Sequence, residues 1–342
     1  QLVPQRRRDY NAEIVQFFSR FVGRNILVSP LDWGLGHAAR MVPVVRFLTK
    51  KNCVTVVCGP NAKEFLNAEL PNIEIITIND RPIRYPAHRI TIFTMLSWLP
   101  VLAVNAIREH FFVKRIIKKK GIDTIISDNR YGLIFRRLEC YFVTHQVYPK
   151  LPAGFGALEK VIGALHRLYL QRFTKCLIPD FENGFSLSGS LAADRVGNNP
   201  KFVKVGILSR FCNYPQNNHK VYDLLILISG QENQRTVFER SLLDKIKDSQ
   251  QKILFVRGVP ANTPPLKDFN NVVFKNMLTS DALAAAITSS KLVICRSGYS
   301  TILDLVALKA HAIFYPTPGQ TEQEYLAERL SGRMSGNDLR RF

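Results

Sequence analysis

The stretch that decides the fold is NILVSPLDWGLGH, residues 25–37. Asn25 to Ser29 form a short apolar run typical of a buried strand, and a helical pattern follows from about His37 to Lys50. A loop with two glycines joins them. A strand, a loop and a helix in this order begin a βαβ unit, so the stretch predicts a parallel sheet covered by helices.

Similar short apolar runs recur along the chain and predict two sheets. After the first run, the strands expected in the first series are 53–58, 73–78, 123–127, 141–144 and 175–178. The second series begins after Val205, and its expected strands are 224–229, 252–256, 272–274, 291–295 and 312–315. We therefore predict an α/β fold with two doubly wound, Rossmann-like domains, residues 20–205 and 206–330, and a polar tail at 331–342.

The chain is strongly basic, with 47 Lys and Arg against 27 Asp and Glu and a net charge of +20. This excess predicts an anionic partner, which can be a nucleic acid, an anionic membrane surface or a phosphorylated substrate. Nucleic acid is not expected, because neither a helix-turn-helix pattern nor an RNP-type aromatic motif accompanies the charge. The six cysteines form no CxxC pair and no apolar stretch follows Arg6 to Arg8, so we expect a cytoplasmic protein without structural zinc or disulfides.

The first glycine loop carries candidate catalytic residues. In open α/β sheets the ligand site lies at the carboxyl ends of the strands, where this loop begins. Gly34 and Gly36 allow a ligand to approach the backbone closely, and His37 can act as a base near neutral pH. Asp32 in the same loop and Asp128 after the predicted strand 123–127 are alternative bases. The alternative role for His37 is to cap the turn, and the loop lacks the GxGxxG pattern of a dinucleotide site.

A second strand–loop–helix junction, residues 294–301, has the composition of a phosphate cradle. Ser297, Gly298 and the N–H groups that follow suit an anion, and Arg296 adds positive charge. Asp304 lies one helical turn further on, where it can accept ribose hydroxyls or serve only as an acid near the helix dipole.

A third junction places Gln323 and Glu324 at the start of a helix. Both side chains can bind the hydroxyls of a sugar, and the alternative is a solvated helix face. No DxD motif follows a predicted strand, so we expect no metal and assign the binding of phosphate to cationic side chains and helix termini.

These features together resemble the MurG-like glycosyltransferases of glycosyltransferase family 28, which have the GT-B fold. The resemblance rests on residues 295–298 (CRSG), Thr301, Asp304 and residues 323–325 (QEY), and on the loop at 34–37. It implies two domains that face a cleft, with a C-terminal end that is truncated. The donor-binding residues that it implies are Arg210, Ser229, Gly230, Met277, Arg296, Ser297, Gly298, Thr301, Asp304, Gln323 and Glu324. The acceptor-side residues that it implies are Gly34, Gly36, His145 and Gln146.

The resemblance also implies an enzyme that transfers a hexose with inversion and without a cofactor. Its expected donor is a UDP-sugar, with N-acetylglucosamine as the sugar, and its expected acceptor is a hydroxyl of a lipid-linked or cell-envelope glycan. His37, or alternatively Asp32 or Asp128, would deprotonate that hydroxyl. Two other functions stay open: a nucleotide-sugar 2-epimerase, and a non-catalytic, membrane-associated protein that binds nucleotide sugars.

One loop departs from the family pattern. Where the family has Gly-Gly-Ser-Gln-Gly, this chain has Ser229-Gly230-Gln231-Glu232-Asn233, with one glycine and an added carboxylate. Asp304 likewise stands where the family has a glutamate. The altered glycine loop is the feature that favours the non-catalytic alternative.

Residues 81–120 combine positive charge with an apolar run. They contain nine Lys or Arg and one acid, and residues 90–107 within them are largely apolar. A membrane-spanning helix is not expected, because Pro100 and Asn105 interrupt the run. We expect instead a peripheral protein on the inner face of an anionic membrane, as for similar proteins that meet polyprenyl-linked acceptors. The alternative is a buried helix with a solvated basic end.

Overall fold

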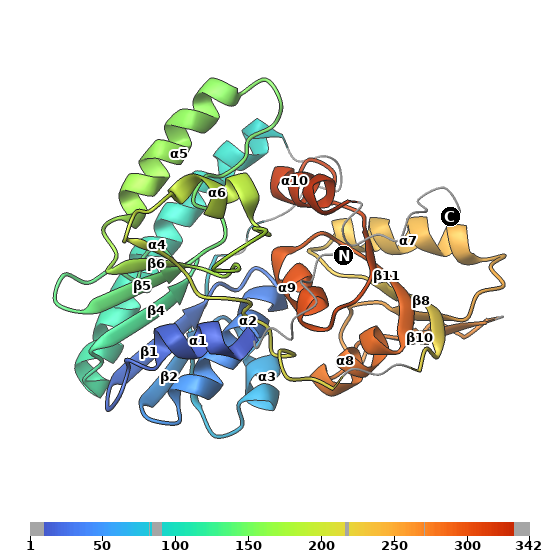
Figure 1. The fold of residues 1–342 in the computed structure, drawn as a ribbon, viewed down its shortest axis with the longest axis horizontal. Coiled ribbons are helices and arrows are strands. Elements are labelled where there is room, and N and C mark those ends of the chain that lie inside the picture. The colour runs from blue at the N-terminus through green and yellow to red at the C-terminus, as the bar shows by residue number, and fades with distance from the viewer. Residues whose placement is uncertain (1–9, 82, 84–90, 216–218, 270, 332–342) are drawn as a thin grey trace. The chain divides into compact units, whose positions relative to one another are not determined.

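The computed structural model of the chain describes residues 10–81, 83, 91–215, 219–269 and 271–331 (Figure 1). The chain divides into two compact units between Arg210 and Phe211, a few residues beyond the predicted domain boundary. Residues 332–342 of the predicted polar tail lie outside the described residues. Each unit is a parallel sheet with helices, so the expected α/β fold is confirmed.

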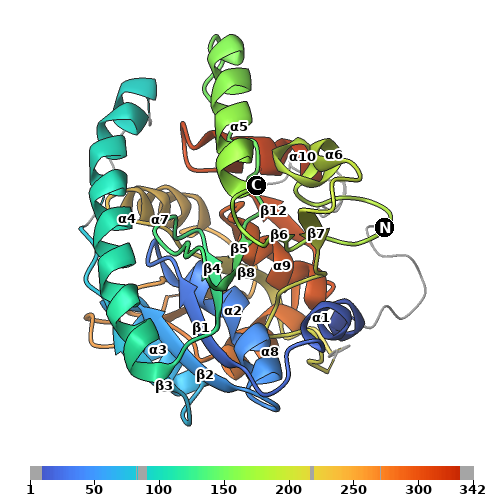
Figure 2. The same cartoon turned by 90° about the vertical axis from the view of Figure 1, so that its left-hand side faces the viewer.

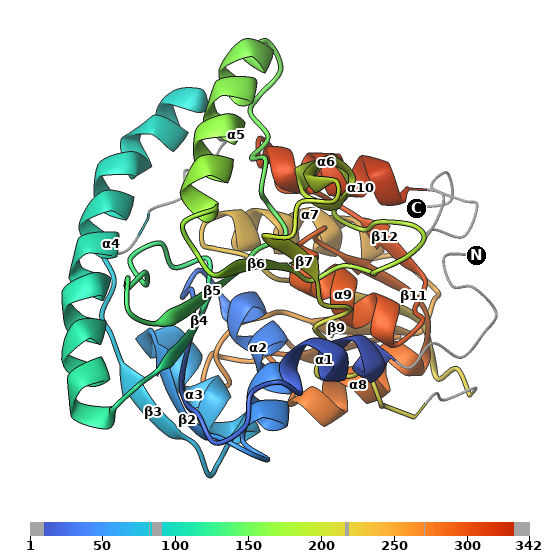
Figure 3. The ribbon, with the colours of Figure 1, turned by 60° about the vertical axis from the view of Figure 1, so that its left-hand side comes forward.

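The first unit is built on a seven-stranded sheet in the order β3-β2-β1-β4-β5-β6-β7. Its strands are β1 (Asn25–Pro30), β2 (Cys53–Cys58), β3 (Glu74–Thr77), β4 (Thr124–Asp128), β5 (Glu139–Val143), β6 (Lys175–Ile178) and β7 (Phe202–Lys204). Its helices are α1 (Tyr10–Phe18), α2 (Leu35–Leu48), α3 (Pro60–Glu69), α4 (Ile92–Lys120), α5 (Gly156–Leu170) and α6 (Ala193–Val196). Helices α4 and α5 cover one face, where Val113 and Leu170 join the apolar core, and α2 lies on the other (Figure 3).

The second unit repeats the design with a five-stranded parallel sheet in the order β10-β9-β8-β11-β12. Its strands are β8 (Tyr222–Leu227), β9 (Ile253–Val256), β10 (Val272–Lys275), β11 (Ser290–Cys295) and β12 (Ala312–Phe314). Its helices are α7 (Gln234–Ile246), α8 (Ser280–Thr288), α9 (Tyr299–Ala307) and α10 (Thr321–Leu330). Phe238 and Leu242 of α7 pack against the strands in the apolar core of this unit.

Each sheet has one point where the strand order reverses. In the first unit the chain moves outward from β1 through β2 and β3, then returns to β4 on the other side of β1. In the second unit the same reversal separates β8 from β11. Ligands of open α/β sheets bind at the carboxyl ends of the strands beside such a reversal. The loops after β1, β4, β8 and β11 are therefore where the topology predicts the sites.

Helix α4 runs through the segment where the sequence predicted an interruption. It continues past Pro100. Asn105 can be buried because its side-chain amide accepts from the backbone N–H of Arg81 at 2.9 Å and donates to the backbone C=O of Arg81 at 3.1 Å. Among the described residues, α4 is the one helix whose length and composition would allow it to cross a membrane. Only 17% of its most apolar window is buried, so most of α4 is not the buried core helix of the alternative interpretation. Arg84, Arg89 and Ile90 of the predicted basic and apolar segment lie outside the described residues.

Candidate functional site

His37 and Asp128 meet at the point of reversal in the first sheet. Asp128 ends β4, and its backbone pairs with Pro30 at the end of β1. His37 lies in the first turn of α2, directly after the glycine loop. Its Nδ1 lies 3.2 Å from Oδ1 of Asp128, whose side chain is fully buried. The sequence named these two residues as alternative bases, whereas the structure joins them as a pair.

Arg40 completes this group from the next turn of α2. Its Nε donates to Oδ2 of Asp128 at 2.7 Å, and its Nη2 donates to Oδ1. Its Nη1 donates to Nδ1 of His145 at 3.2 Å, which brings in the loop after β5. Arg40 and Asp128 are both almost inaccessible to solvent, so this is a buried ion pair with bidentate geometry. We call His37, Arg40, Asp128 and His145 the switch-point cluster.

The contacts of His37 determine which of its nitrogens can react. Its Nδ1 also lies 3.0 Å from Nη2 of Arg40, which can only donate. A protonated Nδ1 donates to Asp128 and leaves the lone pair on Nε2, whereas an unprotonated Nδ1 accepts from Arg40. The doubly protonated imidazolium can keep only the contact with Asp128. Asp128 therefore favours both the form of His37 that accepts a proton at Nε2 and the cation that results.

Burial and charge shift the ionisation of this pair in a direction that suits a base. Burial lowers the pKa of His37 below its ordinary value, more than the neighbouring Asp128 raises it. Burial alone would raise the pKa of Asp128, but the charges of Arg40 and His37 hold it well below its usual range. The side chain of His37 is still 17% exposed. At neutral pH the pair is thus a neutral imidazole beside a carboxylate.

Asp32, the other alternative base, has a structural role. Its carboxylate accepts hydrogen bonds from the backbone N–H groups of Asn61 and Ala62, at 3.3 and 3.1 Å, in the first turn of α3. Gly59 lies so close that a Cβ there would come within 2.0 Å of Oδ2 of Asp32. Burial raises the pKa of Asp32, but its oxygens are already engaged at the start of the helix. Asp32 therefore caps α3 and is a poorer candidate than His37.

The remaining acceptor-side residues lie at the same edge of the first sheet. Gly34 precedes α2 with φ of 99°, a conformation that favours glycine, whereas Gly36 lies inside the helix. Gln146 is half-buried, and its backbone N–H donates to Oγ1 of Thr144 at 3.0 Å. Arg210, which the sequence assigned to the phosphate, lies in this unit with its guanidinium 5.0 Å from the ring centre of Phe65.

In the second unit, the structure corrects the role expected for Arg296. Its guanidinium donates to the backbone carbonyls of Tyr315, Pro316 and Gln234, at 3.1, 2.7 and 3.3 Å. The group is buried over the ring of Phe238, 4.0 Å from its centre, and burial lowers its pKa to about 10. Both terminal nitrogens of Arg296 thus bind backbone carbonyls, and the side chain ties its own loop to the loop after β12 and to the start of α7 instead of presenting charge to a phosphate.

Ser297 also acts inside the protein, whereas the turn after it keeps the geometry of a cradle. Oγ of Ser297, fully buried, donates to the backbone carbonyl of Gln323 at 2.7 Å. Gly298 precedes α9 in an extended conformation without a side-chain cap, and the half-buried Thr301 and Asp304 follow on the helix. The first N–H groups of a helix have no partner within that helix, so this end of α9 offers backbone donors to an anion.

The side chains of Gln323 and Glu324 form hydrogen bonds with the backbone of the loop between β12 and α10. Oε1 of Gln323 accepts from the backbone N–H of Thr317 at 2.9 Å, and Oε1 of Glu324 accepts from that of Gly319 at 2.8 Å. Both side chains are half-buried, which argues against the solvated helix face of the alternative interpretation. Each keeps a second polar atom, Nε2 of Gln323 and Oε2 of Glu324, that a ligand hydroxyl could use.

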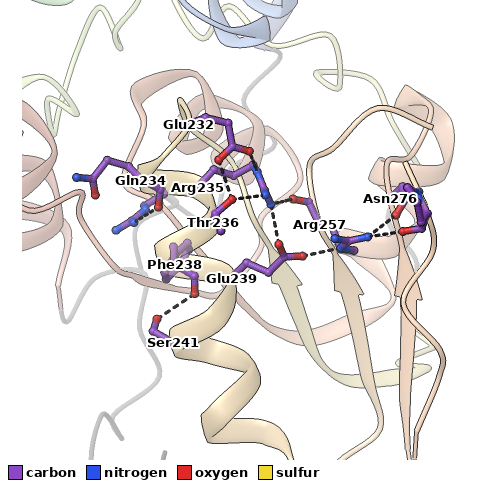
Figure 4. A network of polar contacts seen from close by, with 11 residues as sticks. Glu232, Gln234, Arg235, Thr236, Phe238, Glu239, Ser241, Arg257 and Asn276 are labelled. Carbon is purple, nitrogen blue, oxygen red and sulfur yellow. Dashed lines mark hydrogen bonds and ion pairs between the residues drawn. The ribbon is translucent and has the colours of Figure 1, made fainter. Parts of the chain in front are cut away.

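A row of charges runs from the loop after β8 along the first turns of α7 to the loop after β9, and the sequence did not reveal it (Figure 4). Glu232 pairs with Arg235, whose Nη1 donates to Oε2 of Glu239 at 3.0 Å. Oε1 of Glu239 in turn accepts from Nε of Arg257 at 2.6 Å. At the end of the row, Nη1 of Arg257 donates to Oδ1 of Asn276 at 3.1 Å. The row ties together the loops that follow β8, β9 and β10.

The other predicted donor residues lie around this row. Ser229 and Gly230 begin the loop after β8, and Gly230 has φ of 116° with open space where a Cβ would stand. Met277 follows β10 and is 48% exposed. Within the described part of the chain, no group of three or more His, Cys, Asp or Glu residues could hold a metal ion.

Sequence reasoning missed Arg40, Glu239 and Arg257. Arg40 follows His37 by three residues, a spacing that places both side chains on one face of a helix and could have indicated the contact. Glu239 has the i, i+4 relation to Arg235 that favours an ion pair, but Arg257 lies in the loop after β9 and nothing local predicts its contact with Glu239.

Comparison with known proteins agrees with this arrangement. Residues 235–339 match the glycosyltransferase family 28 C-terminal domain. No curated protein matches the chain by sequence. The chain superimposes on the glycotransferase of kitacinnamycin with a TM-score of 0.60 and 13% identity, covering 91% of this chain and 84% of that one.

Two further solved structures have a similar fold. Phytolacca americana UGT2 gives a TM-score of 0.59 with 13% identity, covering 93% of this chain and 87% of that one. Acinetobacter baumannii MurG gives 0.51 with 12% identity, covering 91% and 84%. At these identities the structures establish the GT-B fold, and the domain match adds a family 28 domain in the second unit, in agreement with the resemblance predicted from the sequence. The chain is a glycosyltransferase of the GT-B type whose second unit carries a family 28 C-terminal domain.

Proposed function

We propose that this glycosyltransferase moves N-acetylglucosamine, with inversion, from a UDP-sugar to a hydroxyl of a lipid-linked or cell-envelope glycan. The observation that carries the proposal is the contact between His37 and Asp128 at the point of reversal in the first sheet. A hydroxyl attacks a sugar only if its proton is removed, and a neutral imidazole oriented by a carboxylate is suited to that task.

The chemical step needs one base and one good leaving group. The acceptor oxygen forms a bond to the anomeric carbon while the bond from that carbon to the diphosphate oxygen breaks. The proton of the hydroxyl goes to Nε2 of His37, and Asp128 stabilises the imidazolium through Nδ1. The bonding electrons leave with UDP. Because the pKa of His37 is lowered, kcat/KM should be high at neutral pH and fall as the pH drops below the ordinary histidine range.

The donor is assigned to the second unit, without a metal or cofactor. Backbone donors at the start of α9 would hold the diphosphate, with Asp304 on the ribose and Gln323 and Glu324 on the sugar. Two structures of similar fold support a nucleoside diphosphate: UGT2 was solved with UDP-2-fluoro-glucose and pterostilbene, and the spinosyn rhamnosyltransferase SpnG with thymidine diphosphate. Arg210 is proposed to add charge near the diphosphate, as the sequence predicted.

A lipid-linked acceptor is supported by apolar surface on α4 and α5. Both helices run beside the strands of the first sheet and project beyond them in Figure 2. Large apolar side chains are exposed on both: Phe93, Leu96, Leu99, Ile107 and Phe111 on α4, and Leu158, Val161, Leu165 and Leu168 on α5. The α5 residues follow one another by three, four and three positions, which places them on one face.

This surface is suited to an anionic membrane. The exposed cations Arg108 and Lys160 lie on the same two helices, and the net charge of the chain is +20. Both helices begin at the carboxyl edge of the sheet, the edge that holds His37, because each follows a strand and leads to the next parallel one. We therefore propose a cytoplasmic protein that rests on the inner face of the membrane, where its acceptor is anchored.

A transfer assay tests the proposal. The chain is incubated with UDP-N-acetylglucosamine, with and without polyprenyl-linked glycans in anionic vesicles, and UDP release is followed together with the glycolipid product. The proposal expects UDP release that depends on the acceptor. Release of UDP without an acceptor would instead favour the 2-epimerase, and tight UDP binding without turnover would favour a non-catalytic binder.

A further inference from the structure

The carboxylate of Glu232 occupies the first turn of α7. It accepts a hydrogen bond from Oγ1 of Thr236 at 2.7 Å and another from the backbone N–H of Thr236. It also pairs with Nε of Arg235, whose side chain is only 8% exposed. The side chain of Glu232 itself is 56% exposed, so one end of this contact faces solvent. The carboxylate of Glu232 is thus an anion that belongs to the protein and binds both the cation of Arg235 and the N-terminal turn of α7.

The start of α7 lies next to the loop that leads to α9, where the proposed function places the diphosphate, because Nη2 of Arg296 in that loop donates to the backbone carbonyl of Gln234 at 3.3 Å. The loop after β8 lies at the point of reversal in the second sheet, where ligands of such sheets bind. Beside Gly230 the backbone borders open space, so the loop has room for a ligand. A phosphate here would meet the negative charge of Glu232, which Arg235 and Thr236 keep ionised by lowering its pKa against the opposing effect of burial.

The positive charge of Arg235 is already balanced by carboxylates of the protein, so it is not available to neutralise such a phosphate. Besides Glu232, Arg235 pairs with Glu239, whose Oε2 lies 3.0 Å from Nη1 of Arg235. The other carboxylate oxygen of Glu239 pairs with Arg257. The row Glu232, Arg235, Glu239, Arg257 therefore sums to zero charge. Replacing Glu232 by a neutral residue would turn it into a row with one net positive charge.

We propose that Glu232 is a selectivity residue that favours the UDP-sugar over the product UDP. The inference rests on the proposed function, because it takes the donor to be a nucleoside diphosphate sugar. In a UDP-sugar each phosphate carries one negative charge, whereas the terminal phosphate of free UDP gains a further charge near pH 7, since its second pKa is about 6. A fixed carboxylate beside the diphosphate repels the product more than the donor and so speeds product release.

Calorimetric titration of Glu232→Gln with UDP, UDP-N-acetylglucosamine and uridine tests this. Glutamine keeps the size of the side chain and loses the charge. We expect UDP to bind about two- to fivefold more tightly than to the wild type, the UDP-sugar to gain less, and uridine to be unchanged. The gain for UDP should shrink as salt is added. In turnover, the variant should show stronger inhibition by UDP.

Asp244→Asn is the matched control, because it removes one negative charge from the exposed far end of the same helix. It should leave all three affinities unchanged. Glu232→Asp keeps the charge and should stay close to the wild type. Equal shifts for UDP and uridine in Glu232→Gln, or no shift for UDP, would overturn the inference while leaving the proposed function intact. If the wild type bound neither UDP nor the UDP-sugar, both would be wrong.

Discussion

The two sheets share one topology but use their points of reversal differently. In the first unit, the side chains of His37, Arg40 and Asp128 bind one another and leave Nε2 of a histidine for chemistry. In the second unit, the side chains of Arg296 and Ser297 donate to backbone carbonyls, and the backbone at the start of α9 is what a ligand can use. The difference fits the proposed division of roles, in which side chains of the first unit carry out the reaction and backbone groups at the start of α9 hold the diphosphate.

The largest effect on stability is expected from breaking the buried pair of the first unit. Asp128→Ala leaves the guanidinium of Arg40 buried without its carboxylate and should cost about 3–5 kcal/mol in the free energy of unfolding. Urea denaturation at pH 7 measures it. Glu74→Ala, which removes an exposed partner of Lys120, is the control and should cost less than about 1 kcal/mol. A small effect for Asp128→Ala would mean that the switch-point cluster is not tightly coupled.

Arg296 should matter for stability more than for binding. Arg296→Met leaves the carbonyls of Tyr315, Pro316 and Gln234 without their donor, and we expect a loss of about 1–3 kcal/mol in unfolding free energy. UDP affinity should change little in the fraction that remains folded. Thermal unfolding and UDP titration are compared with Arg240→Met, an exposed arginine on α7. If the stability were unchanged but UDP affinity were lost, the role predicted from the sequence would be the right one.

Asp304 should show the opposite behaviour. Asp304→Ala is expected to weaken UDP binding by about 1–3 kcal/mol, because hydrogen bonds between ribose hydroxyls and a charged group are lost. Thermal unfolding of the variant is measured alongside, so that a loss of affinity is separated from a loss of stability. Calorimetry with UDP measures the difference, with Asp248→Ala as a control on the exposed surface of the same unit. Equal affinities would exclude Asp304 from the donor site.

The smallest effect concerns the membrane surface of the first unit. Leu165 and Leu168 are 62% and 60% exposed, so replacing both by Ser should not disturb the fold. Binding to anionic vesicles should fall by about fivefold, because less apolar area enters the interface, and salt should weaken it further. Val237→Ser removes a half-exposed apolar side chain from the second unit and should have no effect on sedimentation with vesicles. Unchanged binding of the double variant would remove α5 from the membrane surface.

The strands were predictable because buried parallel strands are short apolar runs. The predicted runs at 53–58 and 175–178 coincide with β2 and β6, whereas β7 was not predicted. The long helix α4 was only partly anticipated, because the fold accommodates Pro100 and buries Asn105 on the backbone of Arg81. A pattern of residue types cannot reveal such a tertiary contact.

The places of the candidate site residues in the fold were more predictable than their contacts. The rule that ligands bind at the carboxyl ends of strands located His37, Asp128, Ser297 and Gly298. The same rule could not predict that Asp128 contacts His37 or that Arg296 donates to backbone carbonyls, because the directions of side chains depend on contacts between separate loops. Glu232 was visible as a departure from the family loop, but its pairing with Arg235 needed the structure.

The central claim is that His37 acts as the base while the second unit binds the donor. The most direct measurement compares His37→Ala with the wild type in two assays, sugar transfer to a lipid-linked acceptor and calorimetric titration with UDP. The account predicts a fall in kcat of about 10²- to 10⁴-fold with UDP affinity nearly unchanged. Normal turnover by the variant would contradict it, and so would a loss of UDP binding, because His37 would then hold the diphosphate.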